Sequence, residues 1–226
     1  MRKLVIAFFV LAALGLAAPP VQAGPIVSQW AINQDGVVSD SLNGDPVPSN
    51  WNLAAFDTFT GLGTITASIT GAGDHNILVF LDLQIDEPLN NEFGAVGGPA
   101  PGPGFWWEID EPGYVFGDIY DNFVAGALDG LNGVPAGSPD DVSFALGRNF
   151  ILGPDEVATL NFRTSLVAPD GVPHLIHTDP DSDLSVYFSS DLTIRGGGEP
   201  PIPEPSTLTL VGLGLAAAAR RLRRRG

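Results

Sequence analysis

Residues 24–201 of this 226-residue chain consist of short runs of β-branched and aromatic residues separated by clusters of Gly, Pro, Asp and Asn. Such runs are typical of strands, and no part of this segment repeats its apolar residues with the period of a helix. In residues 76–85 every odd position from 77 onward is aliphatic, and Leu78 and Phe80 are apolar as well. We therefore expect a strand here whose first half is buried on both faces, as in the middle of a sheet.

The number of expected strands predicts an all-β fold. Eight or nine short strands in about 180 residues favour a single β-sandwich, jelly-roll or Ig-like, with a closed barrel as the alternative. The chain has no cysteine, so its stability must come from buried apolar side chains rather than disulfides. The clearest strands are expected at 62–70, 76–85, 157–167 and 184–194, and weaker ones at 26–32, 51–60, 105–109, 114–116 and 142–151. Long loops are expected at 33–50, 86–104, 129–141 and 168–183.

The N-terminal 23 residues have the three parts of a secretory signal peptide. Arg2 and Lys3 precede an uncharged apolar run from Leu4 to Ala18, and Val21-Gln22-Ala23 is a cleavage site of the small-x-small type. We expect cleavage between Ala23 and Gly24. The alternative is an uncleaved membrane anchor, for which the apolar run is short.

The C-terminal segment, 202–226, places Pro203-Glu204-Pro205 before an apolar run at 206–219 and a tail with five arginines. The 14 residues of that run would form a helix about 21 Å long, shorter than the roughly 30 Å hydrocarbon core of a bilayer. Arginine side chains could extend its reach, and their charge would hold this end in the cytoplasm. Hydropathy alone leaves a membrane span and a buried helix open.

This order of a Pro-Glu-Pro motif, an apolar segment and an arginine cluster resembles the PEP-CTERM sorting signal. The resemblance implies that an exosortase-like enzyme processes the tail of a secreted protein after a short transmembrane helix has anchored it transiently in the inner membrane. It also implies delivery to the cell envelope or extracellular matrix of a Gram-negative bacterium, with a role in a biofilm matrix alongside exopolysaccharide. The chain then divides into a signal peptide (1–23), an acidic β-sandwich domain (24–201) and a sorting signal (202–226).

The charge of the body restricts its partners. Residues 24–203 hold 25 acidic residues against three arginines, a net charge of −22. Such a body repels nucleic acid and anionic lipid, and it either stays well solvated or attracts divalent cations. Two acidic loops are candidate calcium sites, although Asp also favours turns through local hydrogen bonds. They comprise Asp179, Asp181 and Asp183 in one loop, and Asp118 and Asp121 with Asn122 in the other. The first is not an EF-hand, because Leu184 and Ser190 occupy the places of the required Gly and Glu.

A glycan site is the best chemical candidate in the body. Trp106 and Trp107 precede Glu108, Asp110 and Glu111, and Trp faces can stack on sugar rings while carboxylates bind hydroxyls. The alternative is that one Trp belongs to the core and the acids form a solvated edge.

The three histidines give weaker signals, and no nucleophile elbow, HExxH or Walker motif is present. We interpret His75 as a turn residue. His174 and His177 would point to opposite faces of an extended strand, which disfavours a shared metal.

We therefore expect a structural or adhesive secreted protein that is not an enzyme. A carbohydrate-binding module that acts on exopolysaccharide through Trp106 or Trp107 is the alternative. A secreted hydrolase, with converging carboxylates or a histidine in a cleft, is a further one.

Overall fold

The computed structural model describes residues 24–85, 90–113 and 115–196. The predicted signal peptide and the predicted sorting helix lie outside these residues. No helix within the described ranges is long and apolar enough to cross a membrane. The elements are β1 (Ile26–Gln34), β2 (Val37–Asp40), β3 (Trp51–Phe56), β4 (Gly63–Thr70), β5 (Gly73–Gln84), β6 (Phe93–Gly97), β7 (Phe105–Asp110), α1 (Ile119–Ala125), β8 (Ser143–Leu152), β9 (Glu156–Ser165), β10 (His174–Asp179) and β11 (Leu184–Gly196).

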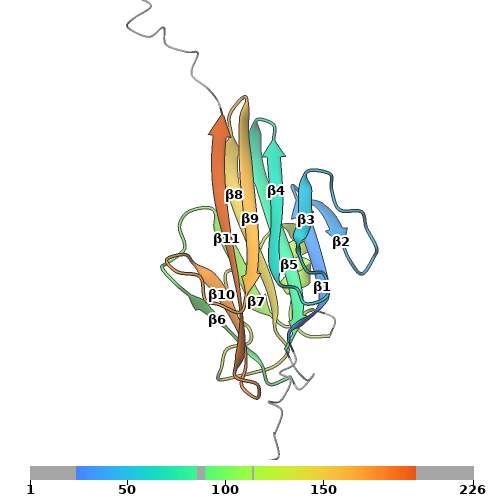
Figure 1. Ribbon diagram of the computed structural model, residues 1–226, viewed down its shortest axis with the longest axis vertical. Coiled ribbons are helices and arrows are strands. Elements are labelled where there is room, and N and C mark those ends of the chain that lie inside the picture. Colours follow the sequence, from blue (N-terminus) through green and yellow to red (C-terminus); the bar gives the residue numbers. More distant parts are fainter. Residues whose placement is uncertain (1–23, 86–89, 114, 197–226) are drawn as a thin grey trace, which may run out of the picture.

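The strands form two antiparallel sheets that pack against each other (Figure 1). The five-stranded sheet has the order β2-β1-β5-β8-β7, and the six-stranded sheet has the order β3-β4-β9-β11-β10-β6. The predicted all-β fold in the form of a β-sandwich is therefore confirmed, with two separate sheets rather than one closed barrel.

The main core lies between the sheets and is built from the alternate positions of each strand. Leu81 and Phe144 of the five-stranded sheet meet Phe162 and Phe188 of the six-stranded sheet, and the Phe144 and Phe188 rings stack with centroids 6.1 Å apart. β5 is the central strand of its sheet, and Leu78 on its other face is buried too. This is the strand that the sequence predicted to be covered on both sides.

Three short strands, β2, β6 and β10, lie inside segments predicted as loops. β2 follows Asp35 and Gly36, whose φ angles of 54° and 85° fit the tight turn of a hairpin. β6 and β10 pair with each other at the edge of the six-stranded sheet, where they add main-chain hydrogen bonds without a long apolar run. Partners far away in the sequence, rather than local propensity, make these segments strands.

The strand predicted at 114–116 is wrong. Val115 and Phe116 form a bend between Gly113 and Gly117, and the Gly113 N–H donates to the Phe116 carbonyl at 3.0 Å. This tight loop leads into α1, which the sequence did not predict. Seven residues are too few to show a helical period.

Helix α1 covers the outer face of the five-stranded sheet. Ile119 and Phe123 of the helix are fully buried against Leu78 and Phe80 of β5. The Phe80 and Phe123 ring centroids lie 5.8 Å apart. This second, smaller core occupies the middle of the outer face and leaves the ends of that face available for polar groups.

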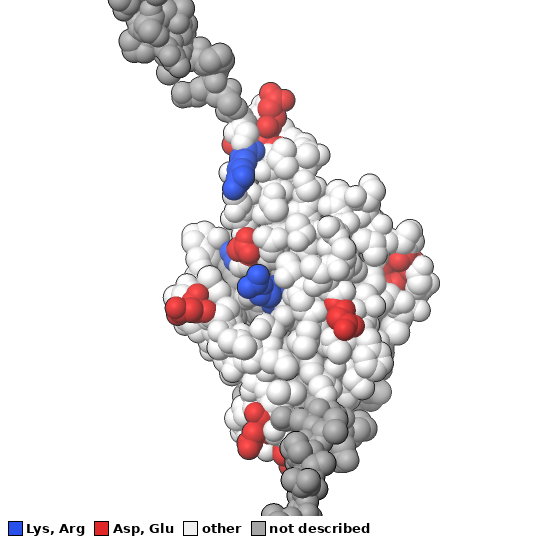
Figure 2. All heavy atoms as spheres, viewed as in Figure 1, with Lys and Arg blue, Asp and Glu red and all other residues white. Residues whose placement is uncertain are grey.

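The outer face of the six-stranded sheet carries Thr, Ser and Asn side chains. Thr66 donates to Asn161 at 3.0 Å, and Asn161 donates to Asp191 at 3.1 Å across neighbouring strands. Figure 2 shows the face on which β4, β9 and β11 lie toward the reader, and charged side chains are few on it. This confirms the polar outer face that the alternation in 62–70 predicted.

Candidate functional site

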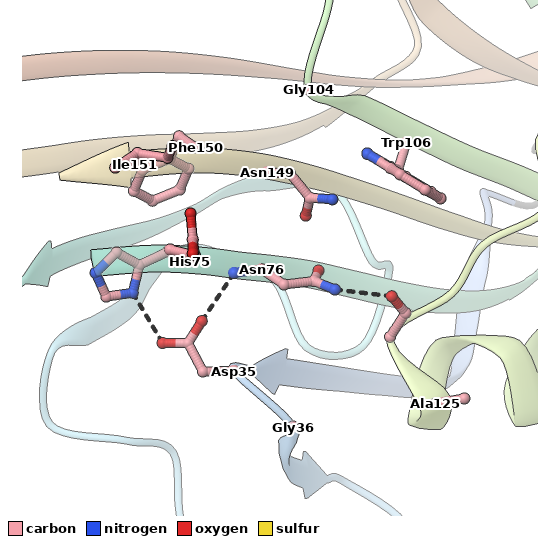
Figure 3. Close-up of a pocket in the computed structure, with 12 residues that line it drawn as sticks. Asp35, Gly36, His75, Asn76, Gly104, Trp106, Ala125, Asn149, Phe150 and Ile151 are labelled. Atoms are coloured by element: carbon pink, nitrogen blue, oxygen red, sulfur yellow. Dashed lines mark hydrogen bonds and ion pairs between the residues drawn. The ribbon is translucent and has the colours of Figure 1, made fainter.

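A groove of about 730 Å³ lies on the outer face of the five-stranded sheet, beside the C-terminal end of α1 (Figure 3). Its lining comes from segments far apart in the sequence: the β1–β2 turn, the start of β5, the end of α1, β7 and β8. The residues that line it include one tryptophan, one histidine, one phenylalanine, two aspartates and two asparagines. The fold therefore gathers aromatic and hydrogen-bonding groups in one place.

The two candidate tryptophans point to different sides of β7. Trp106 lines the groove and is 40% exposed, and it pairs with Gly147 of β8. Trp107, the next residue, packs against the core between the sheets. The structure thus places Trp106 where it can meet a ligand and makes Trp107 part of the packing.

Gly104 shapes the groove beside Trp106. Its φ is +76°, and a Cβ added there would lie 2.3 Å from the Asn149 carbonyl oxygen. The Asn149 N–H also donates to the Gly104 carbonyl at 2.8 Å. Only glycine fits this close approach of two backbones, which fixes the chain where it enters β7.

His75 and Asp35, which are among the lining residues, form an ion pair, and the His75 side chain lies on the face of β5 that Phe150 shares rather than on that of Asn149. His75 Nδ1 lies 2.9 Å from Asp35 Oδ2, and His75 Nε2 lies 2.9 Å from the Gly71 carbonyl. Partial burial lowers the pKa of His75, but the Gly71 carbonyl and the Asp35 carboxylate outweigh it, so the pKa is raised. Two acceptors around one imidazole favour the form with two N–H groups. The ring also stacks on Phe150, with centroids 5.5 Å apart.

Asparagine side chains hold the wall formed by the end of α1. Asn76 Nδ2 donates to the Gly126 carbonyl at 2.7 Å. Asn33, which is fully buried, donates to the carbonyls of Phe123 at 2.7 Å and Val124 at 3.1 Å. Gly126 ends the helix with a φ of 70°. These donors satisfy carbonyls that a helix leaves unpaired at its C-terminal end, and they fix the helix relative to β1 and β5.

The polar groups left facing the groove include hydrogen-bond acceptors. Asn149 Oδ1 is buried and has no hydrogen-bond partner in the described part of the chain. Asp74 is exposed, and its carboxylate accepts no hydrogen bond from residues within the described ranges. A ligand that donates hydrogen bonds can reach the exposed Asp74 carboxylate.

Sequence reasoning singled out only part of this groove. Trp106 was a candidate, and His75 was interpreted as a turn residue, whereas it lies in β5 and contributes to the lining. Asp35, Asn76 and Asn149 were missed. The Asp35-Gly36 pair between two β-type runs is a hairpin signal that could have placed Asp35 in a turn. No local signal marks Asn149.

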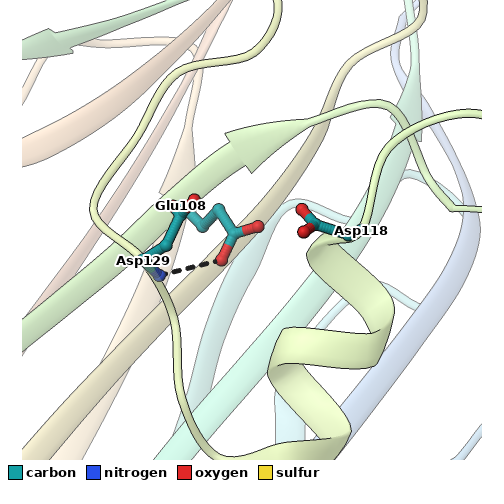
Figure 4. A group of neighbouring side chains, drawn as sticks. All are labelled: Glu108, Asp118 and Asp129. Carbon is teal, nitrogen blue, oxygen red and sulfur yellow. Dashed lines mark hydrogen bonds between the residues drawn. The ribbon is translucent and has the colours of Figure 1, made fainter.

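A group of acids lies on the same outer face, at the N-terminal end of α1 (Figure 4). Carboxylate oxygens of Glu108, Asp118 and Asp129 lie within 4.8 Å of one another. Glu108 is 1% exposed and accepts hydrogen bonds from Asn122 Nδ2 at 3.0 Å and from the Asp129 N–H at 3.1 Å. Burial raises the pKa of Glu108 to about 7, although these two hydrogen bonds favour the charged form.

The predicted calcium ligands are only partly brought together. Asp118 joins Glu108 and Asp129, whereas Asp121 is exposed on α1. In the other loop, Asp179 accepts hydrogen bonds from the N–H groups of Asp181 at 2.9 Å and Ser182 at 3.2 Å, and so stabilises its own turn. Within the described ranges, Asp179, Asp181 and Asp183 are not among the acids whose oxygens converge. Calcium binding stays a prediction.

His174 and His177 have different surroundings. His177 is fully buried, its Nε2 lies 2.6 Å from Glu92 Oε2, and its ring meets Phe144 edge-on. His174 packs edge-on against Tyr187. Asp82 is buried at the same end of the sandwich as Glu92. Burial, with the charges of Asp141 and Glu92, raises the pKa of Asp82 to about 7. None of these groups is among the described residues that line the groove.

The described part of the chain is thus a β-sandwich with an aromatic and acidic groove on one outer face. Residues 201–225 match the family model of the PEP-CTERM protein-sorting motif. This confirms the resemblance, and the predicted sorting residues Pro203, Glu204 and Pro205 fall within the match but outside the described residues. The motif indicates an extracellular bacterial protein that is exported, sorted by an exosortase-like system and associated with the cell envelope. No curated protein and no solved structure matches the chain.

Proposed function

We propose that the protein is an adhesive component of the bacterial envelope or extracellular matrix that binds a polysaccharide in the groove beside Trp106. The observation that carries the proposal is a tryptophan, Trp106, that is 40% exposed in a groove whose lining residues include two asparagines and two aspartates. Exposed Trp faces offer a flat apolar surface to the C–H side of a sugar ring, and the polar groups can bond its hydroxyls. The sorting motif supports this role, because it directs the protein to where such polymers are found.

The size of the groove suits a short stretch of a polymer. Ligand sites commonly have volumes of about 300–1,000 Å³, and a groove of about 730 Å³ falls in this range. A few sugar units could lie along it, with one ring on Trp106. The groove is built on strands and on a helix end fixed by Asn33 and Asn76, so its shape is largely preformed.

The arrangement favours binding over hydrolysis. His75 is one of the lining residues, but both of its ring nitrogens are directed at acceptors of the chain itself, so neither is left to act as a base. A hydrolase could instead use the converging carboxylates of Glu108, Asp118 and Asp129. Both carboxylate oxygens of Glu108, however, accept hydrogen bonds that link β7 to α1 and to the loop after it. We interpret these acids as structural or metal-binding groups of a protein that is not an enzyme.

Trp106→Ala tests the proposal. We expect a loss of about 30-fold in affinity for a bound oligosaccharide, since an aromatic residue central to an interface contributes about 2 kcal/mol or more. Affinity is measured by titration calorimetry after a screen of polysaccharides for retention of the full-length protein. Phe59→Ala is the matched control, because Phe59 is an exposed aromatic residue in the β3–β4 turn, outside the groove lining. Equal affinities for the wild type and Trp106→Ala would refute the assignment.

A further inference from the structure

We propose that the groove prefers a polysaccharide with free amino groups over one with carboxylate or sulfate groups. This inference rests on the proposed function, because it concerns the ligand of the same groove. It starts from charge: Asp35 and Asp74 line the groove, and no lysine or arginine is among its described lining residues. An anionic sugar would place its charge beside these carboxylates with no cation to offset the repulsion.

The one other titratable group in the lining does not reverse this balance. His75 is held between Asp35 and the Gly71 carbonyl, so any positive charge on its ring is already paired with Asp35. Asp35 is further fixed by the Asn76 N–H, which donates to its Oδ1 at 2.8 Å. With Asp35 and His75 paired, the exposed carboxylate of Asp74 remains as the net charge of the groove.

The hydrogen-bonding groups point the same way. The side-chain amide of Asn76 is used inward on the Gly126 carbonyl, whereas Asn149 Oδ1 and the Asp74 carboxylate accept nothing from the described part of the chain. A protonated amine has three donors and no acceptor, so it matches the exposed carboxylate of Asp74. The indole N–H of Trp106 can bond a ring or hydroxyl oxygen of the same sugar.

The charge of the whole body adds to the preference. The net charge of −22 over residues 24–203 repels polyanions and attracts polycations before contact. That field also attracts any polycation without a specific site. The experiment must therefore separate recognition in the groove from general attraction to the acidic surface.

The test compares three oligosaccharides of equal length on the full-length protein at about pH 6, where an amine of this kind is charged. They are a β-1,4-linked glucosamine oligomer, its N-acetylated counterpart and a uronic acid oligomer. We expect affinity to fall in that order. Asp74→Asn should reduce the advantage of the glucosamine oligomer over the N-acetylated one about two- to fivefold, as removal of one exposed charge pair implies. Binding of the N-acetylated oligomer should stay unchanged.

Asp170→Asn is the matched control, because it removes the same charge from an exposed loop after β9, at the other end of the sandwich from Asp74. It should leave all three affinities unchanged. Equal loss in both variants, or glucosamine binding that survives Trp106→Ala, would mean general attraction and overturn the inference. Equal or tighter binding of the uronic acid oligomer, lost in Trp106→Ala, would overturn the inference while the proposed function stands. If no polysaccharide binds, the proposed function itself fails.

Discussion

Removal of the Asn33 side chain should weaken the anchoring of α1 on the sheet. Asn33 is fully buried and makes three hydrogen bonds: it donates to the carbonyls of Phe123 and Val124, and its Oδ1 accepts from the Gly36 N–H at 2.9 Å. At about 1 kcal/mol net for each, Asn33→Ala should lower the free energy of unfolding by about 3 kcal/mol. For a domain of this size that corresponds to a fall in melting temperature of about 6–12 °C.

Thermal unfolding followed by circular dichroism measures this effect. The matched control is Asn52→Ala, because Asn52 is exposed and its side chain accepts a single local hydrogen bond from the Ala54 N–H at 2.8 Å. Its effect on the free energy of unfolding should stay within about 0.5 kcal/mol. If Asn33→Ala shifts the melting temperature by less than about 2 °C, or no more than the control, Asn33 does not anchor the helix. The groove wall at Gly126 would then need another explanation.

Three further predictions concern pH and metal. The raised pKa of His75 predicts a contribution to stability that is fully present below pH 6.5 and is lost as the pH rises through the higher pKa of the folded protein. Asp35→Asn should flatten this part of a profile of stability against pH. An unchanged profile would count against the ion pair. The raised pKa of Glu108 predicts a contribution to stability that is fully present below about pH 4.5 and is lost as the pH rises through about 7. Over this range the free energy of unfolding should fall by up to about 1.4 kcal/mol per pH unit, and Glu108→Gln should remove this dependence on pH. Millimolar calcium should raise the melting temperature of the wild type more than that of Glu108→Gln, whereas equal midpoints with calcium and with a chelator would reject a calcium ion at this acid group.

Local alternation was enough to predict the long strands of this fold. In β5 and β9 apolar residues recur at every second position, and this pattern decides both the extended conformation and the buried face. The pattern could not reveal β6 and β10, because their stability comes from pairing with each other and with β11. Nor could it reveal α1, whose two buried residues need the outer face of the sheet to pack against.

The amino-acid sequence by itself determined the all-β class, the acidic charge of the body and the sorting motif at residues 201–225, because each depends on residues that are neighbours in the chain. The groove depended on tertiary structure. Asn76, Trp106 and Asn149 belong to three separate strands, and only the register of β5, β7 and β8 places them on one face. Register follows from the packing of the whole sheet, so residues that meet across strands leave no local signal in the sequence.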